Sequence, residues 1–133
     1  MRVVFADSFY FFALLIDRDA AHARASQFAR EFQGRLITTE WALTELADGL
    51  ATSAHRRIFA ALRSDLNASS SITIVKYTSA LLDAGVELYD QRPDKKWSLT
   101  DCVSFVVMQR EGITEALTGD RHYEQAGFTA LLK

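Results

Sequence analysis

Val3-Val4-Phe5-Ala6-Asp7-Ser8 opens the chain with a short apolar run that ends at an aspartate. Such a run predicts a buried strand over Arg2–Ala6, followed by a helix that Ser8 can cap. The same order returns near the other end of the chain, where Ile113–Thr118 is followed by Gly119 and Asp120. Both stretches therefore predict a strand that is followed by an aspartate, which places a carboxylate beyond the carboxyl end of that strand.

Between these two stretches, strand-like runs alternate with amphipathic, helix-like segments. Besides Arg2–Ala6, strands are expected at Leu36–Thr38, Ile72–Tyr77, Ile113–Thr118 and Phe128–Leu132. Helices are expected over Phe9–Ile16, Ala21–Phe32, Trp41–Leu50, Ile58–Leu66, Leu81–Tyr89 and Leu99–Glu111, with Gly34 and Gly112 ending two of them. This alternation predicts an α/β fold with a parallel sheet covered on both faces. In such sheets the ligand site lies beyond the carboxyl ends of the strands, where the strand order reverses.

Length and composition predict one globular domain spanning residues 1–133. Apolar residues make up 49% of the chain and the net charge is −2, which excludes intrinsic disorder and a strongly basic nucleic-acid-binding domain. The single cysteine, Cys102, excludes a disulfide framework and favours a reduced, cytoplasmic setting. The longest apolar run, Phe9–Ile16, is too short to cross a membrane. A signal peptide is disfavoured because Asp7 precedes that run and Arg2 is the only basic residue upstream of it.

Four acidic residues stand near the predicted carboxyl edge of the sheet. Asp7 and Asp120 follow predicted strands, Asp101 lies in the first turn of a helix, and Glu45 lies in the helix after the second strand. Two carboxylates at ~4 Å repel each other by about 4 kcal/mol at an effective dielectric constant near 20. A cluster of carboxylates therefore needs a proton or a cation, and its oxygen ligands suit Mg²⁺ or Mn²⁺.

Each of these residues also has a purely structural interpretation. Asp7 can cap the first helix, and Ser98 and Asp101 have the spacing of a capping box. Glu45 can be an exposed helical residue, and Asp120 can form a turn. No single position decides between a structural and a chemical role.

Taken together, four stretches of the chain resemble the PIN-domain ribonucleases, and within them the VapC-like toxins of type II toxin–antitoxin pairs. Tyr123 stands where that family usually has phenylalanine. The stretches that carry the resemblance are Val3-Val4-Phe5-Ala6-Asp7-Ser8, Leu36-Ile37-Thr38-Thr39-Glu40-Trp41-Ala42-Leu43-Thr44-Glu45-Leu46, Trp97-Ser98-Leu99-Thr100-Asp101-Cys102-Val103-Ser104-Phe105 and Ala116-Leu117-Thr118-Gly119-Asp120-Arg121-His122-Tyr123-Glu124-Gln125-Ala126-Gly127-Phe128.

The resemblance implies a three-layer α/β/α PIN-like domain with a five-stranded parallel sheet. It implies that Asp7 and Asp101 supply the main ligands of one or two Mg²⁺ or Mn²⁺ ions and that Asp120 completes the site. Glu45 would bind a second ion or orient the water that attacks an RNA phosphodiester. Glu40 is the alternative glutamate, but it points roughly 140° away from Glu45 on a helix, and the spacing from the second strand favours Glu45.

Several other residues are assigned to supporting roles. Ser8, Ser104 and Thr118 are expected to hydrogen-bond the carboxylates or bound waters. His122 is expected to order the turn after the strand that ends at Thr118. The remaining expectations are that Cys102 packs in the core, that His22 and His55 lie on the surface, and that Arg56, Arg57 and Arg121 are candidates for guiding RNA.

The family resemblance further implies an RNA substrate, a small antitoxin protein as partner and a homodimer. Apolar surface for the dimer could come from Phe9–Phe12 or from the helices between Trp41 and Leu66, which could equally form the core. Two alternatives remain within the family, a non-catalytic RNA-binding module and a solitary nuclease in RNA processing. A phospho-accepting signalling domain is disfavoured because Ser8, not a second acid, follows Asp7, and the only late lysine is Lys133.

Overall fold

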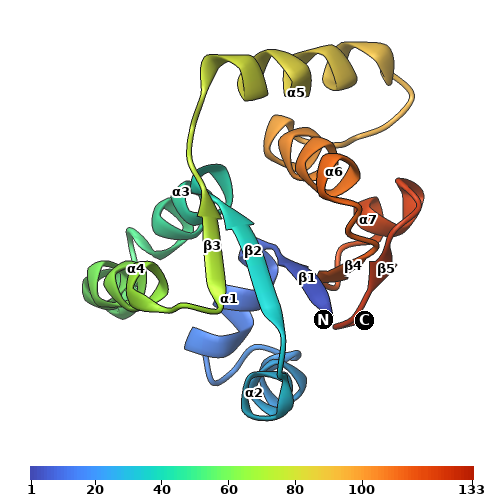
Figure 1. Cartoon of the computed structure of the whole chain (residues 1–133). Coiled ribbons are helices and arrows are strands. Elements are labelled where there is room, and N and C mark those ends of the chain that lie inside the picture. The colour runs from blue at the N-terminus through green and yellow to red at the C-terminus, as the bar shows by residue number, and fades with distance from the viewer.

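The computed structural model describes residues 1–133 and contains a single sheet of five parallel strands in the order β3-β2-β1-β4-β5 (Figure 1). Phe5 of β1 pairs with Ile37 of β2 on one side and with Ala116 of β4 on the other. The parallel α/β fold predicted from the alternation of strands and helices is confirmed. The strands are β1 (Val3–Ala6), β2 (Arg35–Thr39), β3 (Ile72–Val75), β4 (Glu115–Leu117) and β5 (Thr129–Ala130).

Helices cover both faces of this sheet and give the domain three layers. The two hydrophobic clusters identify which helices pack on which face: α1, α2, α3 and α4 contribute to one cluster, and α5, α6 and α7 contribute to the other (Figure 1). No helix is long and apolar enough to cross a lipid bilayer. The helices are α1 (Ser8–Leu15), α2 (His22–Glu31), α3 (Glu40–Leu50), η1 (Ala54–Ile58), α4 (Phe59–Ala68), α5 (Ser79–Gln91), α6 (Leu99–Glu111) and α7 (Arg121–Gln125).

The central strand β1 is buried because its side chains alternate between the two hydrophobic clusters. Val4 and Ala6 belong to the cluster on the α1–α4 side, whereas Phe5 belongs to the cluster on the α5–α7 side, and all three are fully buried. A strand buried on both faces has apolar residues throughout, which explains the continuous apolar run at the start of the chain.

The predicted strand Leu36–Thr38 is one residue shorter at each end than β2, whereas the other predicted strands are longer than the observed ones. In β3 and β4 the predicted run extends past the observed carboxyl end, because side chains and turns interrupt the backbone ladder there. β3 ends at Val75, and the backbone N–H of Tyr77 donates to a carboxylate oxygen of Glu40 at 2.6 Å. β4 ends at Leu117, where a tight turn forms, and the backbone N–H of Leu132 donates to the Thr118 carbonyl at 3.0 Å outside a regular strand.

Two predicted helix ends need correction. Asp7, not Ser8, is the N-cap of α1, and Ser8 is the first residue of that helix. Gly34 does not end α2, which stops at Glu31 with Phe32 as its C-cap. The reason for a glycine at position 34 is close approach, since a Cβ there would lie 2.4 Å from the carbonyl oxygen of Arg2. Gly112 does end α6, in the left-handed conformation (φ 67°) that favours glycine.

The sequence segments expected to offer apolar surface are mostly core. Tyr10 and Phe11 of α1 are buried, as are Leu43 and Leu46 of α3. Of the large apolar side chains that are exposed, Ile58 lies within the second of these segments, and Met1, Tyr77, Val86 and Tyr89 lie elsewhere.

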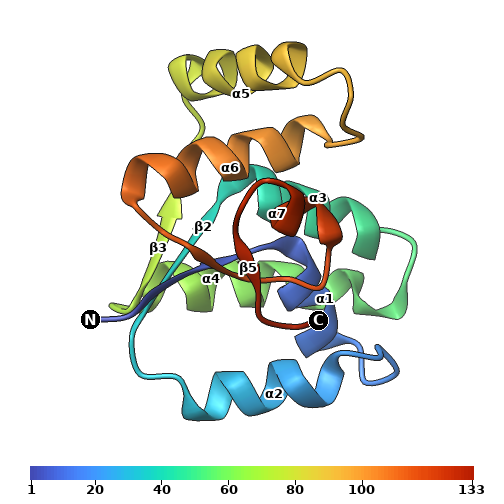
Figure 2. The same ribbon diagram turned by 90° about the vertical axis from the view of Figure 1, so that its right-hand side faces the viewer.

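The strand order reverses between β1 and β4, since the chain adds β2 and β3 on one side of β1 and then β4 and β5 on the other. Figure 2 shows that the carboxyl ends of β1 and β4 and the starts of α1, α6 and α7 lie on the same side of the domain. In open parallel sheets this switch point is where ligands bind.

Candidate active site

A cleft of about 330 Å³ opens at this switch point and is lined mainly by polar residues. Side chains reach it from the ends of β1 and β4, from α1 and α3, and from the start of α6. All four acidic residues singled out in the sequence line it. Its lining consists of Asp7, Ser8, Phe9, Phe12, Glu45, Lys96, Ser98, Asp101, Asp120 and His122.

Asp7 is the most buried carboxylate of the cleft, with 5% of its surface exposed. One carboxylate oxygen accepts a hydrogen bond from the Ser8 backbone N–H at 2.8 Å, and the other accepts one from the Thr118 hydroxyl at 2.9 Å. Burial raises the pKa of Asp7 to about 7, and the charges of Asp101 and Glu45 add to this rise against the Thr118 hydrogen bond. Asp7 therefore binds a proton far more readily than a carboxylate in water.

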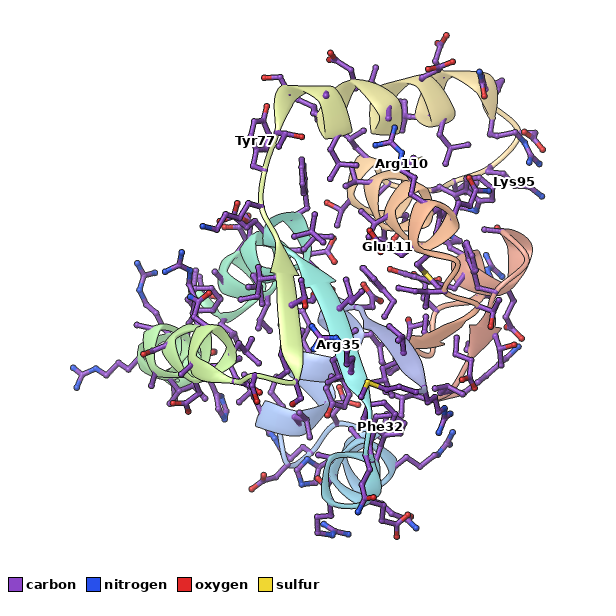
Figure 3. The ribbon with its side chains drawn as sticks, viewed as in Figure 1. Phe32, Arg35, Tyr77, Lys95, Arg110 and Glu111 are labelled. Carbon is purple, nitrogen blue, oxygen red and sulfur yellow. The ribbon has the colours of Figure 1, made fainter.

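Glu45, rather than Glu40, is the glutamate that lines the cleft. The Ser8 hydroxyl donates a hydrogen bond to Glu45, which ties the middle of α3 to the start of α1. Glu40 instead lies beside Trp41, Thr44 and Tyr77 in a separate hollow, where it accepts the Tyr77 backbone N–H (Tyr77 is labelled in Figure 3). The different directions of these two glutamates follow from their spacing of five residues on one helix.

Asp101 takes part in both the capping box of α6 and the cleft. Its Oδ2 atom accepts the Ser98 backbone N–H at 3.1 Å, and the Ser98 hydroxyl accepts the Asp101 N–H at 3.0 Å, which confirms the capping box. The same Oδ2 atom lies 3.0 Å from His122 Nδ1. Burial is the main cause that raises the pKa of Asp101, and its hydrogen bonds with Ser98 and His122 oppose that rise.

Asp120 and His122 complete the cluster from the start of α7. Asp120 is the N-cap of this helix and accepts the His122 backbone N–H at 2.9 Å. The His122 ring turns back into the cleft, where Nδ1 lies 3.0 Å from Asp101 and 3.5 Å from Asp120. His122 is expected to order the turn, and its backbone N–H does donate to Asp120 there. Its ring has a further place in the cleft that this expectation does not include.

Of the three hydroxyls expected to hydrogen-bond carboxylates or bound waters, that of Ser8 donates to Glu45 and that of Thr118 donates to Asp7, whereas that of Ser104 hydrogen-bonds no carboxylate. Ser104 lies one turn after Asp101 on α6, deeper in the core, and its hydroxyl is fully buried without a hydrogen-bond partner. The hydroxyl of Tyr123 is likewise buried and without a partner that satisfies hydrogen-bond geometry. Burial raises the pKa of Tyr123 well above its usual value, and the nearby Asp7 charge raises it further. Neither hydroxyl lines the cleft, and both are enclosed in the core beneath the carboxylates.

The basic residues named as candidates for guiding RNA do not line the cleft. Arg56 and Arg57 lie in η1 and Arg121 begins α7, and none of them is among the lining residues. The cation that does line the cleft is Lys96, which sequence reasoning missed. Lys96 belongs to the loop before α6, and no periodicity in the sequence predicts which way a loop side chain points.

The remaining histidines and the cysteine lie outside the cleft. Cys102 is fully buried in the core, as expected. His22 is half-buried, not simply a surface residue, because its Nδ1 lies 2.7 Å from the Ala13 carbonyl and links α2 to α1. His55 lies in η1, is also half-buried and does not line the cleft.

The donor set of the cleft suits a hard divalent cation. Asp101, Asp120 and His122 each offer a ligand atom, and these atoms lie within 4.8 Å of one another. Asp7 and Glu45 line the same cleft and add further carboxylate oxygens. Carboxylate oxygens with an imidazole nitrogen match Mg²⁺ or Mn²⁺ better than a thiol-seeking metal. A bound cation would also relieve the repulsion that raises the pKa of Asp7.

Comparison with known proteins identifies a family and two similar structures. The sequence matches the family profile described as "PIN domain" over residues 4–129. The structure is similar to that of VapC20 of Mycobacterium tuberculosis, described as a sarcin–ricin loop cleaving toxin, with a TM-score of 0.86, 25% sequence identity, and coverage of 95% of this chain and 96% of that one. FitAcB from Neisseria gonorrhoeae shares the fold, with a TM-score of 0.67, 13% identity, and coverage of 96% and 94% of the two chains. No curated protein matches the chain in a sequence search.

Proposed function

The chain belongs to the PIN domain family, and on that basis we propose that it is a Mg²⁺- or Mn²⁺-dependent endoribonuclease, the toxin of a type II toxin–antitoxin pair. The proposal rests above all on one observation. Asp7, Glu45, Asp101 and Asp120 come from four separate parts of the chain and line one cleft at the switch point of the sheet.

In this proposal, Asp7, Asp101 and Asp120 hold a divalent cation at the bottom of the cleft. When bound, such an ion supplies positive charge that stabilises the transition state of phosphodiester hydrolysis and makes water a better nucleophile. Asp101 presents a fixed carboxylate because Ser98 and His122 both hydrogen-bond its Oδ2 atom. Thr118 holds the carboxylate of Asp7 in the same way.

Glu45 is suited to orienting the attacking water or to holding a second ion. One of its oxygens accepts the Ser8 hydroxyl, which leaves the other oxygen able to accept a proton or a ligand contact within the cleft. Its place on α3 is held by Leu43 and Leu46, which are buried in the core. A carboxylate on a packed helix keeps the orientation that general-base chemistry requires.

The likeness to VapC20 supports RNA as substrate and a toxin role, because that protein is described as a toxin that cleaves the sarcin–ricin loop and is 25% identical to this chain. We further propose a small antitoxin as partner, a homodimer in solution and a cytoplasmic location. Growth arrest on expression of the chain alone, relieved by co-expression of a small protein from an adjacent gene, would support the pairing. Analytical ultracentrifugation would test the dimer.

The experiment that tests the nuclease is cleavage of two RNA probes, a sarcin–ricin loop hairpin and a mixed RNA pool, by the purified chain with Mg²⁺, Mn²⁺ or a chelator. Asp101→Asn is the informative variant, since it removes the charge while asparagine can still accept the Ser98 backbone hydrogen bond. We expect cleavage with either metal, none with chelator, and a loss of at least about 100-fold in Asp101→Asn.

The matched control is Asp83→Asn, which makes the same change at an exposed position of α5. It should cleave as the unmodified chain does. Cleavage that survives both chelator and Asp101→Asn would contradict the proposed site. Tight RNA binding with no cleavage of either probe would instead favour the non-catalytic RNA-binding module.

A further inference from the structure

A second hollow lies next to the acidic cleft, and none of the four acidic residues of the cleft lines it. It has a volume of about 390 Å³ and is formed by the end of α5, the loop that leads to α6, and Cys102 at its floor. Figure 3 labels Lys95 on this loop. We name it the basic hollow, after its residues Tyr89, Arg92, Lys95, Lys96 and Trp97.

Lys96 joins the basic hollow to the acidic cleft, since it lines both. It is exposed and forms no ion pair, although carboxylates line the cleft on its other side. A lysine at that boundary is therefore available to a ligand that occupies both spaces.

The charges of the basic hollow leave an excess of positive charge facing solvent. Arg92 is neutralised by Asp94 through two hydrogen bonds of 3.0 Å. Lys95 Nζ lies 4.0 Å from the same Asp94 carboxylate, which the Arg92 guanidinium already engages. Lys95 and Lys96 therefore outweigh Asp90, the other acidic residue of the hollow. An anion would find two ammonium groups there, directly beside a cleft of the opposite charge.

Trp97, which lines the basic hollow, is held in place by contacts with its neighbours. The Arg92 guanidinium lies 5.2 Å from the centre of the Trp97 ring, in a cation–π arrangement. Trp97 is 7% exposed, donates its indole N–H to Gln125 at 3.0 Å, and packs edge-on against Phe105. Tyr89 lies at the rim with 55% of its surface exposed, so an aromatic face is available to a ligand.

From these contacts we propose that the basic hollow binds the nucleotide next to the scissile phosphate of a single-stranded RNA segment. Lys95 and Lys96 contact the backbone phosphate, and a base stacks on Tyr89. The carboxylates of the cleft repel the phosphates of RNA, except for the phosphate that would meet the proposed divalent cation. Lysine contacts to a neighbouring phosphate would offset this repulsion. Stacking and phosphate contacts tolerate any base, so the subsite adds affinity without choosing a sequence. The inference rests on the proposed nuclease function and specifies where its substrate lies.

Binding is tested with the full chain carrying Asp101→Asn, which prevents turnover, in Mg²⁺ and with a fluorescein-labelled 12-nucleotide single-stranded RNA of mixed sequence. Lys96→Gln should weaken binding about two- to fivefold at physiological salt, as expected for one exposed ion pair. The slope of log affinity against log salt should fall by about 0.7 for each lost phosphate contact, and Lys95→Gln with Lys96→Gln should lower it by about twice that amount. Tyr89→Ala should weaken binding at least about fivefold.

The matched control is Arg30→Gln, which removes one exposed positive charge from α2, away from the α5–α6 loop. It should leave the affinity and the salt slope unchanged. A direct readout comes from Trp97, which becomes the only tryptophan in a Trp41→Phe background. Its fluorescence should change on RNA binding, and the change should be lost in the double lysine variant. The proposal would be overturned if the lysine variants, like Arg30→Gln, left the RNA affinity and the salt slope unchanged. It would also be overturned if RNA binding left Trp97 fluorescence unaltered.

Kinetics separate this inference from the nuclease proposal. In the cleavage-competent chain, the double lysine variant should raise KM with kcat unchanged, because the contact is made equally in the ground and transition states. RNA binding that depends on Lys96 in a chain that never cleaves would refute the nuclease and retain the subsite. Metal-dependent cleavage with an unchanged KM in the double variant would retain the nuclease and refute the subsite.

Discussion

Asp7→Asn should stabilise the metal-free protein at alkaline pH. In the folded chain burial raises the pKa of Asp7 from 3.8 to about 7. A carboxyl whose pKa is raised by folding binds its proton more tightly in the folded state. It therefore contributes stability below its unfolded pKa, and that contribution is lost as the pH rises through about 7. At pH 8.5 the folded protein holds a negative charge on buried Asp7, close to the charges of Asp101 and Glu45. In the unfolded chain the same charge is exposed to water.

The magnitude follows from the same pKa. A change from 3.8 to about 7 corresponds to about 4 kcal/mol over the whole pH range, at about 1.4 kcal/mol for each tenfold change in proton affinity. From pH 5 to pH 8.5 the free energy of unfolding of the unmodified protein should fall by about 3 kcal/mol because Asp7 loses its proton. The Asp7→Asn variant has no such proton to lose, so this fall should be absent. Asparagine is also a good N-cap, so it can retain the hydrogen bond that Asp7 accepts from the Ser8 backbone.

The assay is urea unfolding followed by tryptophan fluorescence in chelator, at pH 5 and at pH 8.5, for the unmodified chain, Asp7→Asn and the exposed control Asp83→Asn. At each pH, the free energy of unfolding of the unmodified chain is subtracted from that of Asp7→Asn. This difference should be about 3 kcal/mol larger at pH 8.5 than at pH 5. Asp83→Asn should show no such increase. A difference that stays constant with pH would refute the argument that burial and neighbouring carboxylates hold a proton on Asp7. Saturating Mg²⁺ or Mn²⁺ should stabilise the unmodified chain at pH 8.5, because an ion takes the place of the proton.

Three further perturbations probe single contacts. Tyr123→Phe should raise the free energy of unfolding in urea by about 1 kcal/mol, because it removes a buried hydroxyl without a partner; a decrease would show that this hydroxyl is hydrogen-bonded. Gly34→Ala should destabilise by about 1–3 kcal/mol, because its Cβ would lie 2.4 Å from the Arg2 carbonyl, and an unchanged urea midpoint would contradict that clash. His122→Ala should weaken Mn²⁺ binding measured by calorimetry, because it removes one of the three ligand atoms that lie within 4.8 Å of one another and the hydrogen bond to Asp101; unchanged Mn²⁺ binding would show that the imidazole is not needed for the ion.

Much of the fold could be predicted because its central strand is buried on both faces. The apolar run Val3–Ala6 has no polar face, and the alternation of such runs with helices leaves a parallel sheet as the simple solution. The strand ends were less predictable. The Tyr77 N–H is taken by a side chain of Glu40, and the chain turns tightly after Leu117, so neither continues the ladder that its apolar sequence suggested.

The acidic residues of the cleft could be located because each has a fixed relation to a secondary-structure element. Asp7 and Asp120 each follow a strand, and the spacing of five residues between Glu40 and Glu45 separates their directions on one helix. His122 and Lys96 could not be located in this way. Their positions depend on how a five-residue helix and a loop pack against the rest of the domain, and that packing leaves no periodic pattern in the sequence.

The sequence left open whether each aspartate caps a helix or lines the candidate site. In the structure each of them does both. Asp7 is the N-cap of α1, Asp101 is the third residue of α6 and closes its capping box, and Asp120 is the N-cap of α7. All three nevertheless line one cleft. Helix N-termini carry partial positive charge, so they stabilise carboxylates that would otherwise repel one another. Backbone N–H groups also fix each carboxylate in place, as those of Ser8, Ser98 and His122 do. Capping is therefore the means by which this fold holds several like charges together in one cleft, and the proposed cation site depends on it.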